Sequence, residues 1–297
     1  RKRQSREAAV HQYGRILKAY NSVVHVSVNS AEILCKLRGK STRGRDALLP
    51  GDIVRLERVS STEGVIEGTE PRTSLLLRPR VANLTQIVVT VAAAAPNPHP
   101  LVVSRFLVLA EHSGIDHIVL CINKIDLAGG NMTEFCTPYE AAGYPVLLVS
   151  AVNGTGLSAL QERLGGEITV FAGPSGAGKS SLLNALSPSL RLAVGAVSDK
   201  IGRGRHTTRR AELLPFAGGY VVDTPGFTQQ ELTGIAADEL ADCFPEFLHF
   251  PGCRFTPCSH SHEPNCAVKA AAADGRLART RYDAYIALLD EIRSVRR

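Results

Sequence analysis

The sequence has no long apolar run. Its longest strongly apolar stretch, residues 87–95, is about half as long as a membrane-spanning helix requires. The chain begins with Arg1 rather than Met, and no charged, apolar and small-residue signal segment follows. We therefore expect a cytoplasmic protein that enters no membrane, with some residues of the gene product missing before Arg1.

The sequence also lacks the even set of cysteines that a disulfide framework requires. It has seven cysteines, and three of them, Cys253, Cys258 and Cys266, fall within 14 residues. Such clustering is typical of a metal site in a reducing compartment. The remaining four are expected to be ordinary structural residues: Cys35, Cys121, Cys136 and Cys243.

Acidic residues are scarce at the beginning of the chain. The whole sequence has a net charge of +6, but residues 1–80 carry 16 basic and 8 acidic side chains, and residues 81–297 carry 18 and 20. The entire basic excess therefore belongs to the first quarter. This favours an N-terminal module that faces a polyanion, although a solvated basic face that serves only solubility is the alternative. With 44% apolar residues, the chain can bury a sizeable core.

Residues 1–80 are expected to form the first of three domains. Between residues 11 and 77, short β segments at 15–18, 22–28, 32–37, 52–59 and 64–67 are separated by Gly and Pro turns. This pattern predicts a small β-barrel of the OB type. Residues 36–45 hold five cations in ten positions, which suits a loop that contacts a nucleic-acid backbone.

Residues 81–234 alternate between apolar strands and helices, and are expected to form the second domain. This alternation predicts a mostly parallel sheet with helices on both faces. The expected strands are 84–94, 117–122, 146–149, 167–172 and 220–222, and the expected helices are 101–112, 157–164 and 179–186. Residues 235–297 are expected to form a third, helical domain with a Cys/His-rich segment before a helix from residue 282 to the end.

One segment matches the phosphate-binding pattern GxxxxGK[ST] in full and lies between an expected strand and an expected helix. Its residues are Gly173, Pro174, Ser175, Gly176, Ala177, Gly178, Lys179 and Ser180, with Ser181 next. The glycines allow backbone N–H groups to surround the α- and β-phosphates at a helix N-terminus. Lys179 would reach the β- and γ-phosphate oxygens, and Ser180 would bind Mg²⁺.

Asn123, Lys124 and Asp126 form the pattern NKxD after the strand expected at 117–122. In GTPases this Asp pairs with N1–H and the N2 amine of guanine. The Lys stem packs along the purine, and the Asn holds the phosphate-binding turn. Ser150 and Ala151 follow the next strand, where the Ala151 amide could contact guanine O6. An ATP-dependent enzyme is disfavoured by Asp126.

The pattern DxxG begins at Asp223 and ends at Gly226, 44 residues after Lys179. At this place Asp223 could hold Mg²⁺ through water, and the Gly226 amide could contact the γ-phosphate. The basic segment 203–210 lies between the two motifs, in the place of a first switch. One of its threonines, Thr207 or Thr208, would complete the Mg²⁺ shell. A flexible basic loop without a switching role is the alternative.

The motifs occur in an unusual order. Small GTPases begin with the phosphate-binding loop and end with the guanine-reading motif. If the phosphate-binding loop is motif 1, the first switch 2, DxxG 3, NKxD 4 and the pair Ser150 and Ala151 5, the order in this chain is 4-5-1-2-3. A circular permutation preserves the packing of the sheet while it changes the connections. As a consequence, the chain after Asp223 leads directly into the C-terminal domain.

The Cys/His-rich segment has the spacing of a zinc site. Cys253, Cys258, His260 and Cys266 supply three thiolates and one imidazole, which make the closed tetrahedral set that structural Zn²⁺ prefers. His262 is a competing ligand that spacing alone does not separate from His260. Buried cysteines and surface histidines without a metal are the alternative.

Taken together, these motifs resemble the ribosome small-subunit-dependent GTPase A family over nearly the whole chain. The resemblance rests on the permuted order, on NKID, GPSGAGKSS, GRGRHTTR and DTPG, and on Cys-x4-Cys-x-His-x2-Glu-Pro-x-Cys-Ala-Val. It implies an OB barrel, a permuted P-loop G domain and a C-terminal zinc-binding domain, with His260 rather than His262 as ligand. It also implies that the protein binds the bacterial 30S subunit and its 16S rRNA late in maturation. The ribosome would stimulate hydrolysis of GTP to GDP and phosphate, and release would follow.

Phe227 stands where many small GTPases carry the Gln that orients the attacking water. An apolar side chain cannot do so, and slow intrinsic hydrolysis that depends on a partner is therefore expected. The resemblance makes His206 a candidate replacement, although it could equally contact RNA or solvent. A second function remains open, that of an RNA-binding zinc protein gated by nucleotide, in which hydrolysis is incidental. A monomer is expected for a factor that docks on a large particle.

Overall fold

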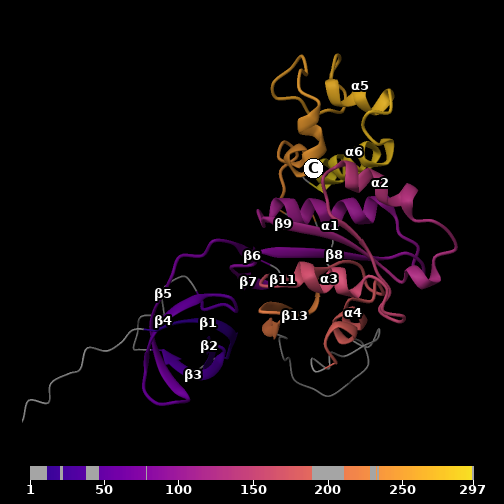
Figure 1. Cartoon of the computed structure of the whole chain (residues 1–297). Coiled ribbons are helices and arrows are strands. Elements are labelled where there is room, and N and C mark those ends of the chain that lie inside the picture. Colours follow the sequence, from indigo (N-terminus) through magenta and orange to yellow (C-terminus); the bar gives the residue numbers. More distant parts are fainter. Residues whose placement is uncertain are drawn as a thin grey trace, which may run out of the picture.

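The computed structural model describes residues 12–20, 23–37, 47–77, 79–188, 211–227, 232 and 234–295. It has three parts, a barrel, a six-stranded sheet covered by helices, and a helical C-terminal part (Figure 1). In the described part of the chain, no helix is both long and apolar enough to cross a membrane.

The barrel contains five strands, which are β1 (Gln12–Ala19), β2 (Val24–Val28), β3 (Ala31–Leu37), β4 (Ile53–Arg58) and β5 (Glu63–Thr69). They close in the order β1-β2-β3-β5-β4, with β4 paired to β1 and only β3 and β5 parallel. Alternate residues such as Val24, Val26 and Val28 fill the interior. This closed five-stranded barrel agrees with the predicted OB type. Most of the basic segment 36–45 lies outside the described residues.

A short hairpin, β6 (Leu75–Leu77) and β7 (Arg80–Ala82), connects the barrel to the sheet. The sheet order is β10-β9-β8-β11-β13-β12. Its strands are β8 (Gln86–Ala92), β9 (His117–Asn123), β10 (Val146–Leu148), β11 (Ile168–Ala172), β12 (Glu212–Phe216) and β13 (Gly219–Phe227). All neighbours are parallel except β12 and β13. The predicted mostly parallel sheet is confirmed.

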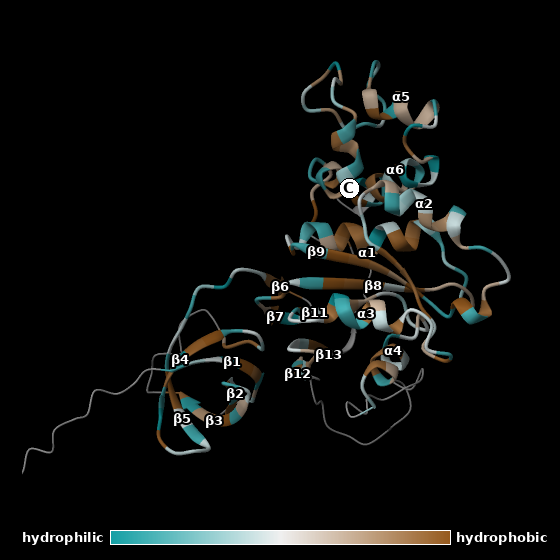
Figure 2. Cartoon of the chain, in the orientation of Figure 1, coloured by the Kyte–Doolittle hydropathy of each residue, from teal (hydrophilic) through white to brown (hydrophobic). Residues whose placement is uncertain are grey.

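Helices cover both faces of this sheet (Figure 1). On one face lie α1 (Pro100–His112) and α2 (Thr133–Ala141), and on the other α3 (Leu157–Leu164) and α4 (Lys179–Leu186). Successive residues of β8 alternate between the two apolar clusters, since Ile87 and Val89 belong to the first and Val88 to the second. Both faces of the strand are therefore buried, which accounts for its continuous apolar run. In Figure 2 most of β8 and β9 is brown.

The C-terminal part packs on α1. It contains the 3₁₀ helices η4 (Leu240–Cys243) and η5 (Pro245–His249), followed by α5 (Ala267–Ala273) and α6 (Arg279–Val295). Arg105 of α1 forms a bidentate ion pair with Glu291 of α6. Val108 of α1 also belongs to the apolar cluster of this part. The third part is thus built directly onto the helix that covers the sheet.

Candidate functional site

The segment 173–178 forms a tight turn from the end of β11 to the start of α4. Gly173 and Gly178 have φ values of +140° and +86°. A Cβ at Gly173 would lie 1.9 Å from the Thr90 carbonyl oxygen, and one at Gly178 would lie 2.3 Å from Asn123 Nδ2. Both positions therefore require glycine, because a side chain would have no space and the wrong backbone conformation. The turn places the N-terminal amides of α4 at the carboxyl edge of the sheet, where an anion binds well.

Lys179 is the first residue of α4 and curls back over the turn. Its Nζ donates to the carbonyl oxygens of Gly173 at 2.7 Å and Pro174 at 2.9 Å. Burial lowers the pKa of this amine from its ordinary 10.5 to about 8. A negative phosphate beside Nζ would favour the charged form again. Ser180 and Ser181, which follow in the same first turn, are half-buried.

Asn123, the last residue of β9, connects the turn to a second loop. Its side chain is 1% exposed. Nδ2 donates to the Ala177 carbonyl at 3.0 Å, and Oδ1 accepts the Ala151 N–H at 3.3 Å. A buried amide that uses both its ends in this way holds three segments at one place. It bonds to the P-loop 54 residues away and to the loop after β10 28 residues away, and so links the two.

Asp126 lies in the short 3₁₀ helix η2 (Ile125–Leu127), directly after the left-handed residue Lys124. Ser150 is fully buried, and its Oγ donates to Asp126 Oδ1 at 2.5 Å. The Val152 and Asn153 amides donate to the same Oγ at 3.3 Å. Ser150 therefore orients the carboxylate and shapes the loop after β10. Ala151 N–H is already bonded to Asn123, so a guanine O6 would have to share or replace that contact.

One contributor to the site has no motif in the sequence. Lys124 Nζ donates to the carbonyl oxygen of Ala95 at 2.6 Å, and Pro96 Cδ lies 3.6 Å from the position of a Cβ on Gly176. The loop after β8 therefore contacts both the P-loop and the NKxD loop. Its only sequence signal is a Pro-rich segment after a buried strand, at the edge of a parallel sheet where ligands bind.

The backbone of the DxxG segment lies beside the P-loop. In the parallel pair β11 and β13, Val170 is opposite Val222 and Ala172 is opposite Phe227. Asp223 and Gly226, which lie in β13 between these two partners, are therefore beside the carboxyl end of β11, the strand that leads into Gly173. The side chains of residues 223–227 lie outside the described part, as does the whole segment 203–210 with His206, Thr207 and Thr208.

A second cluster of functional side chains lies in the C-terminal part. The ligand atoms of Cys253, Cys258, His260 and Cys266 all lie within 4.8 Å of one another. Cys253 Sγ is 3.7 Å from Cys266 Sγ and 3.6 Å from His260 Nδ1, which is 3.4 Å from Cys266 Sγ. Tetrahedral Zn²⁺ with its usual bond lengths requires about 3.8 Å between two sulfurs and about 3.5 Å between sulfur and nitrogen. The four residues therefore fit a metal ion, zinc in particular.

The turn that carries His260 is held by Glu263. The Glu263 carboxylate accepts the Ser259 N–H at 2.8 Å and the Ser261 N–H at 3.2 Å, on either side of His260. Burial would raise the pKa of Glu263, but these hydrogen bonds lower it to about 2. Burial also lowers the pKa of His260, which favours the neutral imidazole that metals bind. His262 lies outside the cluster, with Nδ1 at 3.0 Å from Ser261 Oγ.

Two tyrosines of α6 hold the same turn through hydrogen bonds to its backbone carbonyls. Tyr282 Oη donates to the His260 carbonyl at 2.9 Å, and Tyr285 Oη donates to the Ser259 carbonyl at 2.7 Å. Cys266 caps α5, because its sulfur accepts the Lys269 N–H at 3.5 Å. The cluster is therefore an organised part of the fold and not a set of cysteines brought close by chance.

Comparison with known proteins agrees with this arrangement. A model of the RsgA GTPase family matches residues 69–233. The small ribosomal subunit biogenesis GTPase RsgA of Clostridium perfringens is 43% identical over 281 residues, which cover 94% of this chain and 97% of that protein. The crystal structure of YjeQ from Thermotoga maritima superposes with a TM-score of 0.82 at 36% identity, and covers 95% of this chain and 99% of that one. A structure of YloQ, described as a circularly permuted GTPase, also gives 0.82 at 34% identity, with coverages of 99% and 98%.

In the sheet, β8, β9 and β10 precede the P-loop strand β11 in sequence, whereas in ordinary small GTPases the P-loop strand comes first. Together with the structural likenesses, this order defines the protein as a circularly permuted P-loop GTPase. The chain belongs to the RsgA GTPase family. The family resemblance expected from the motifs is thereby confirmed.

Proposed function

We propose that this GTPase acts in late maturation of the bacterial 30S ribosomal subunit. Hydrolysis of GTP to GDP and phosphate would drive release of the GTPase from the subunit. The relatives carry the name of small ribosomal subunit biogenesis GTPases. The structural observation that supports the nucleotide site best is the Asn123 side chain, which joins the P-loop to the loop of Ser150 and Ala151.

We propose one continuous nucleotide site at the carboxyl edge of the sheet. Guanine would lie against Lys124, Asp126 and the Ala151 amide, and the phosphates against the P-loop. Asp126 is the specificity determinant, because a carboxylate accepts hydrogen bonds from guanine N1–H and N2 but has no counterpart on adenine. The nucleotide-contacting set is Asn123, Lys124, Asp126, Ser150, Ala151, Gly173 to Ser181, Thr207, Thr208, Asp223 and Gly226.

Lys179 would act directly in hydrolysis. Charge spreads over the phosphoryl oxygens in the transition state, and an ammonium beside the β- and γ-phosphates stabilises it. Ser180 and Asp223 would hold Mg²⁺, which neutralises charge on the β- and γ-phosphate oxygens when bound. Phe227 cannot orient water, so hydrolysis would depend on the ribosomal partner, with His206 as the candidate residue that positions the attacking water.

We propose that Cys253, Cys258, His260 and Cys266 hold one structural Zn²⁺ per chain. Four protein ligands leave no open position for catalysis, so the metal would stabilise the loops around it rather than react. Loss of the metal would release the turn that Glu263 and Tyr282 support, and with it the outer end of the C-terminal part.

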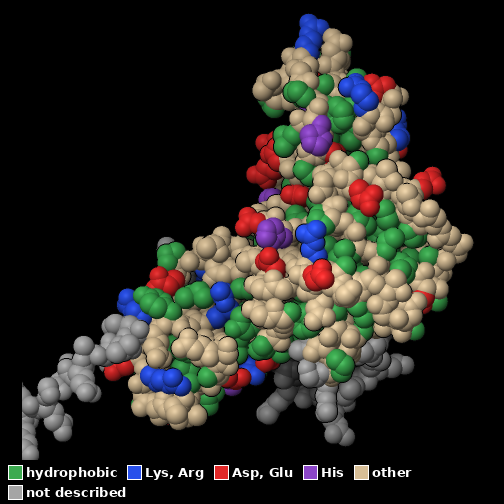
Figure 3. All heavy atoms as spheres, in the orientation of Figure 1, with side chains coloured by type: hydrophobic (Ala, Val, Ile, Leu, Met, Phe, Trp, Pro, Cys, Tyr) green, Lys and Arg blue, Asp and Glu red, His purple; other side chains and the backbone are tan. Residues whose placement is uncertain are grey.

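In this proposal each of the three parts of the chain has its own function. Residues 1–80 form the RNA-binding barrel, 81–234 the GTPase domain and 235–297 the zinc-binding domain. Lys and Arg side chains are exposed on the visible face of the barrel (Figure 3), which suits contact with 16S rRNA. The protein would work as a cytoplasmic monomer that docks on the 30S particle.

The alternative is an RNA-binding zinc protein in which GTP only orders the switches. GTP turnover measured with and without purified 30S subunits distinguishes the two functions. We expect slow intrinsic turnover and a large stimulation by 30S, with none by 50S subunits at the same concentration. An unchanged rate in the presence of 30S would remove the proposed function and leave the alternative.

A further inference from the structure

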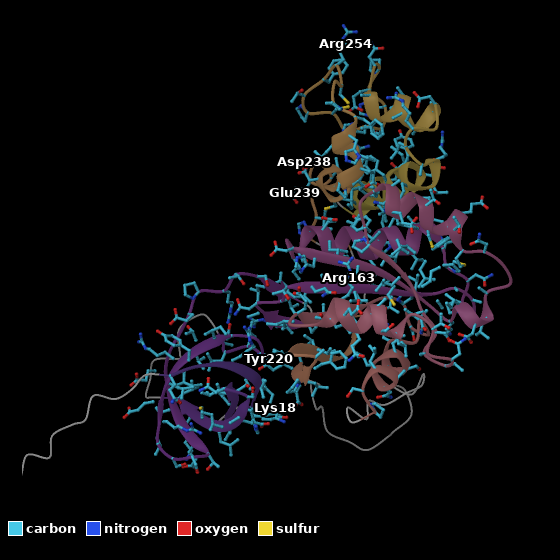
Figure 4. All side chains as sticks on the ribbon, viewed as in Figure 1. Lys18, Arg163, Tyr220, Asp238, Glu239 and Arg254 are labelled. Atoms are coloured by element: carbon cyan, nitrogen blue, oxygen red, sulfur yellow. The ribbon has the colours of Figure 1, made fainter. Side chains whose placement is uncertain are left out.

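Among the described residues, two side-chain hydrogen bonds join the barrel to the sheet. Lys18 Nζ of β1 lies 2.8 Å from Glu212 Oε1 of β12, and Tyr220 Oη of β13 donates to Ser27 Oγ of β2 at 3.1 Å. In Figure 4 the labelled Lys18 and Tyr220 lie at the junction of the barrel and the edge of the sheet. The barrel is therefore attached to the one antiparallel strand pair of the sheet, β12 and β13.

An irregularity in β1 makes this attachment possible. The register of β1 against β2 shifts between Ile16 and Lys18, and as a result two adjacent apolar residues are both buried. Ile16 belongs to the barrel core, whereas Leu17 belongs to the apolar cluster of the sheet, together with Leu213 and Val222. One residue of β1 thus anchors the barrel in the sheet, and the next residue carries the ion pair.

The two polar contacts occupy opposite ends of the strand pair. Glu212 is opposite Asp223, and Tyr220 is opposite Pro215. Along β13, Tyr220 and Asp223 are three positions apart, a distance of about 10 Å. Glu212 comes directly after Ala211, which follows the segment 203–210, and Asp223 begins the DxxG motif. The ion pair therefore lies where both proposed switches enter the strand pair, while the tyrosine contact lies at the far end.

We propose that the barrel senses the nucleotide state through the ion pair of Lys18 and Glu212, with the Tyr220 and Leu17 contacts as a fixed pivot. This inference rests on the proposed nucleotide site. In GTPases, contacts of the γ-phosphate and Mg²⁺ order both switches, and hydrolysis releases them. A displacement of Glu212 would move its ion-pair partner Lys18. A displacement of the backbone at Asp223 would act on Lys18 through Glu212, with which Asp223 is paired. The position of the RNA-facing barrel would then differ between the GTP and GDP states.

Distance measurements between the barrel and the sheet test this proposal. Spin labels attached through an unnatural amino acid at the exposed positions Val59, in the barrel, and Glu162, in α3, leave all native cysteines unlabelled. Double electron–electron resonance then gives the distance distribution with GDP and with a non-hydrolysable GTP analogue. We expect two distinct distributions for the otherwise unaltered chain.

Three variants identify the contact responsible. Lys18→Glu alone should make the distributions with the two nucleotides coincide, and the double exchange Lys18→Glu with Glu212→Lys should separate them again. Tyr220→Phe removes only the pivot hydrogen bond and should leave the two distributions distinct. Coincident distributions in the unaltered chain, or distinct ones in Lys18→Glu, would overturn the inference.

Nucleotide affinity, measured on the same samples with a fluorescent GDP, keeps this result apart from the proposed function. Neither Lys18 nor Glu212 belongs to the proposed nucleotide-contacting set, and exchanging their side chains leaves the backbone pairing of Glu212 with Asp223 in place, so GDP affinity should not change. Absence of guanine-nucleotide binding by the unaltered chain would contradict the proposed function itself and the inference with it. Normal binding without a change in distance would contradict the inference alone.

Discussion

Asn123 and Ala177 lie 54 residues apart, yet the Asn123 amide donates to the Ala177 carbonyl at 3.0 Å. This hydrogen bond joins the guanine-reading loop to the P-loop, although the permuted chain reaches the former first. Because the contact is buried and Asn123 Oδ1 also accepts from Ala151, both loops depend on one side chain.

Replacement Asn123→Ala should therefore weaken guanine-nucleotide binding more than it weakens the fold. Loss of a buried hydrogen bond with its partner left unsatisfied costs about 1–3 kcal/mol, so we expect GDP affinity to fall roughly tenfold to hundredfold. Titration with fluorescent GDP measures the change. The control is Asn131→Ala, whose exposed side chain accepts hydrogen bonds from the amide and the hydroxyl of Thr133, the first residue of α2. Equal GDP affinities for Asn123→Ala and the unaltered chain would contradict the assigned role.

Lys179 predicts a pH dependence of nucleotide binding. Its pKa is lowered from 10.5 to about 8 by burial, so the folded chain releases this proton near pH 8, whereas the unfolded chain keeps it up to about pH 10.5. Between these values the unfolded state binds more protons, and stability without nucleotide rises with pH. Nucleotide phosphates restore the charge.

Calorimetry of GDP binding at pH 8, in two buffers of different ionisation enthalpy, should therefore show an uptake of about half a proton per nucleotide. The uptake should vanish below pH 7, where Lys179 is already charged. Lys179→Arg, whose guanidinium stays charged, should show no uptake at pH 8 in any binding that remains. Zero uptake by the unaltered chain at pH 8 would refute the coupling of this amine to the phosphates.

Metal analysis tests the cysteine cluster. We expect about one zinc per chain in the purified protein, because the ligand geometry matches a closed tetrahedral site. Cys258→Ser should lose the metal and lower the melting temperature. Cys243→Ser, a matched control at a buried cysteine outside the cluster, should retain it. A folded unaltered protein that contains no metal would contradict the proposed zinc site.

Arg281 predicts a large effect on stability. This α6 residue is 1% exposed, pairs with buried Glu246 at 2.6 Å and donates to Ser104 of α1 at 3.0 Å, with its guanidinium carbon 4.6 Å from the centre of the Phe244 ring. Arg281→Met would leave a buried carboxylate unpaired, at a cost of about 3–5 kcal/mol.

Urea denaturation of Arg281→Met measures this cost. The control on the same helix is Arg279→Met, which removes an exposed pair with Asp283 and should cost less than about 1 kcal/mol. Comparable midpoints for the two variants would mean that the buried pair does not hold the C-terminal part to α1. The double variant Arg281→Met with Glu246→Gln should recover part of the loss, since no charge then remains unpaired.

Much of the sheet could be predicted from the sequence, because strands buried on both faces are continuously apolar. The expected strand 117–122 differs from β9 by one residue, and the expected helices 157–164 and 179–186 match α3 and α4. A helix and a strand of this domain were missed. Helix α2 contains Pro138 and two threonines, and buried Cys136 and Tyr139 hold it in place. Strand β12 is short, contains Pro215 and lies at the sheet edge, where proline is tolerated.

The candidate site was predictable where a motif carries its own chemistry, and unpredictable where distant segments meet. The P-loop and NKID patterns predicted residues that the structure brings together at the edge of the sheet. The cysteine spacing predicted the residues of the C-terminal cluster. Spacing alone left His260 and His262 equivalent. The family resemblance favoured His260, and the fold places His260 in the cluster through the turn that Glu263 holds. The contact of Lys124 with the Ala95 carbonyl has no signal in local sequence, because it depends on the packing of β8 beside β9.

The most direct test combines guanine recognition with stimulation by the ribosome. Asp126→Asn exchanges the acceptor that reads guanine for an amide that suits xanthine, while the P-loop stays intact. With 30S subunits present, the unaltered chain should hydrolyse GTP rapidly, and the variant should hydrolyse xanthosine triphosphate rapidly but GTP slowly. Hydrolysis of GTP by Asp126→Asn at the rate of the unaltered chain, with no gain for xanthosine triphosphate, would contradict the account.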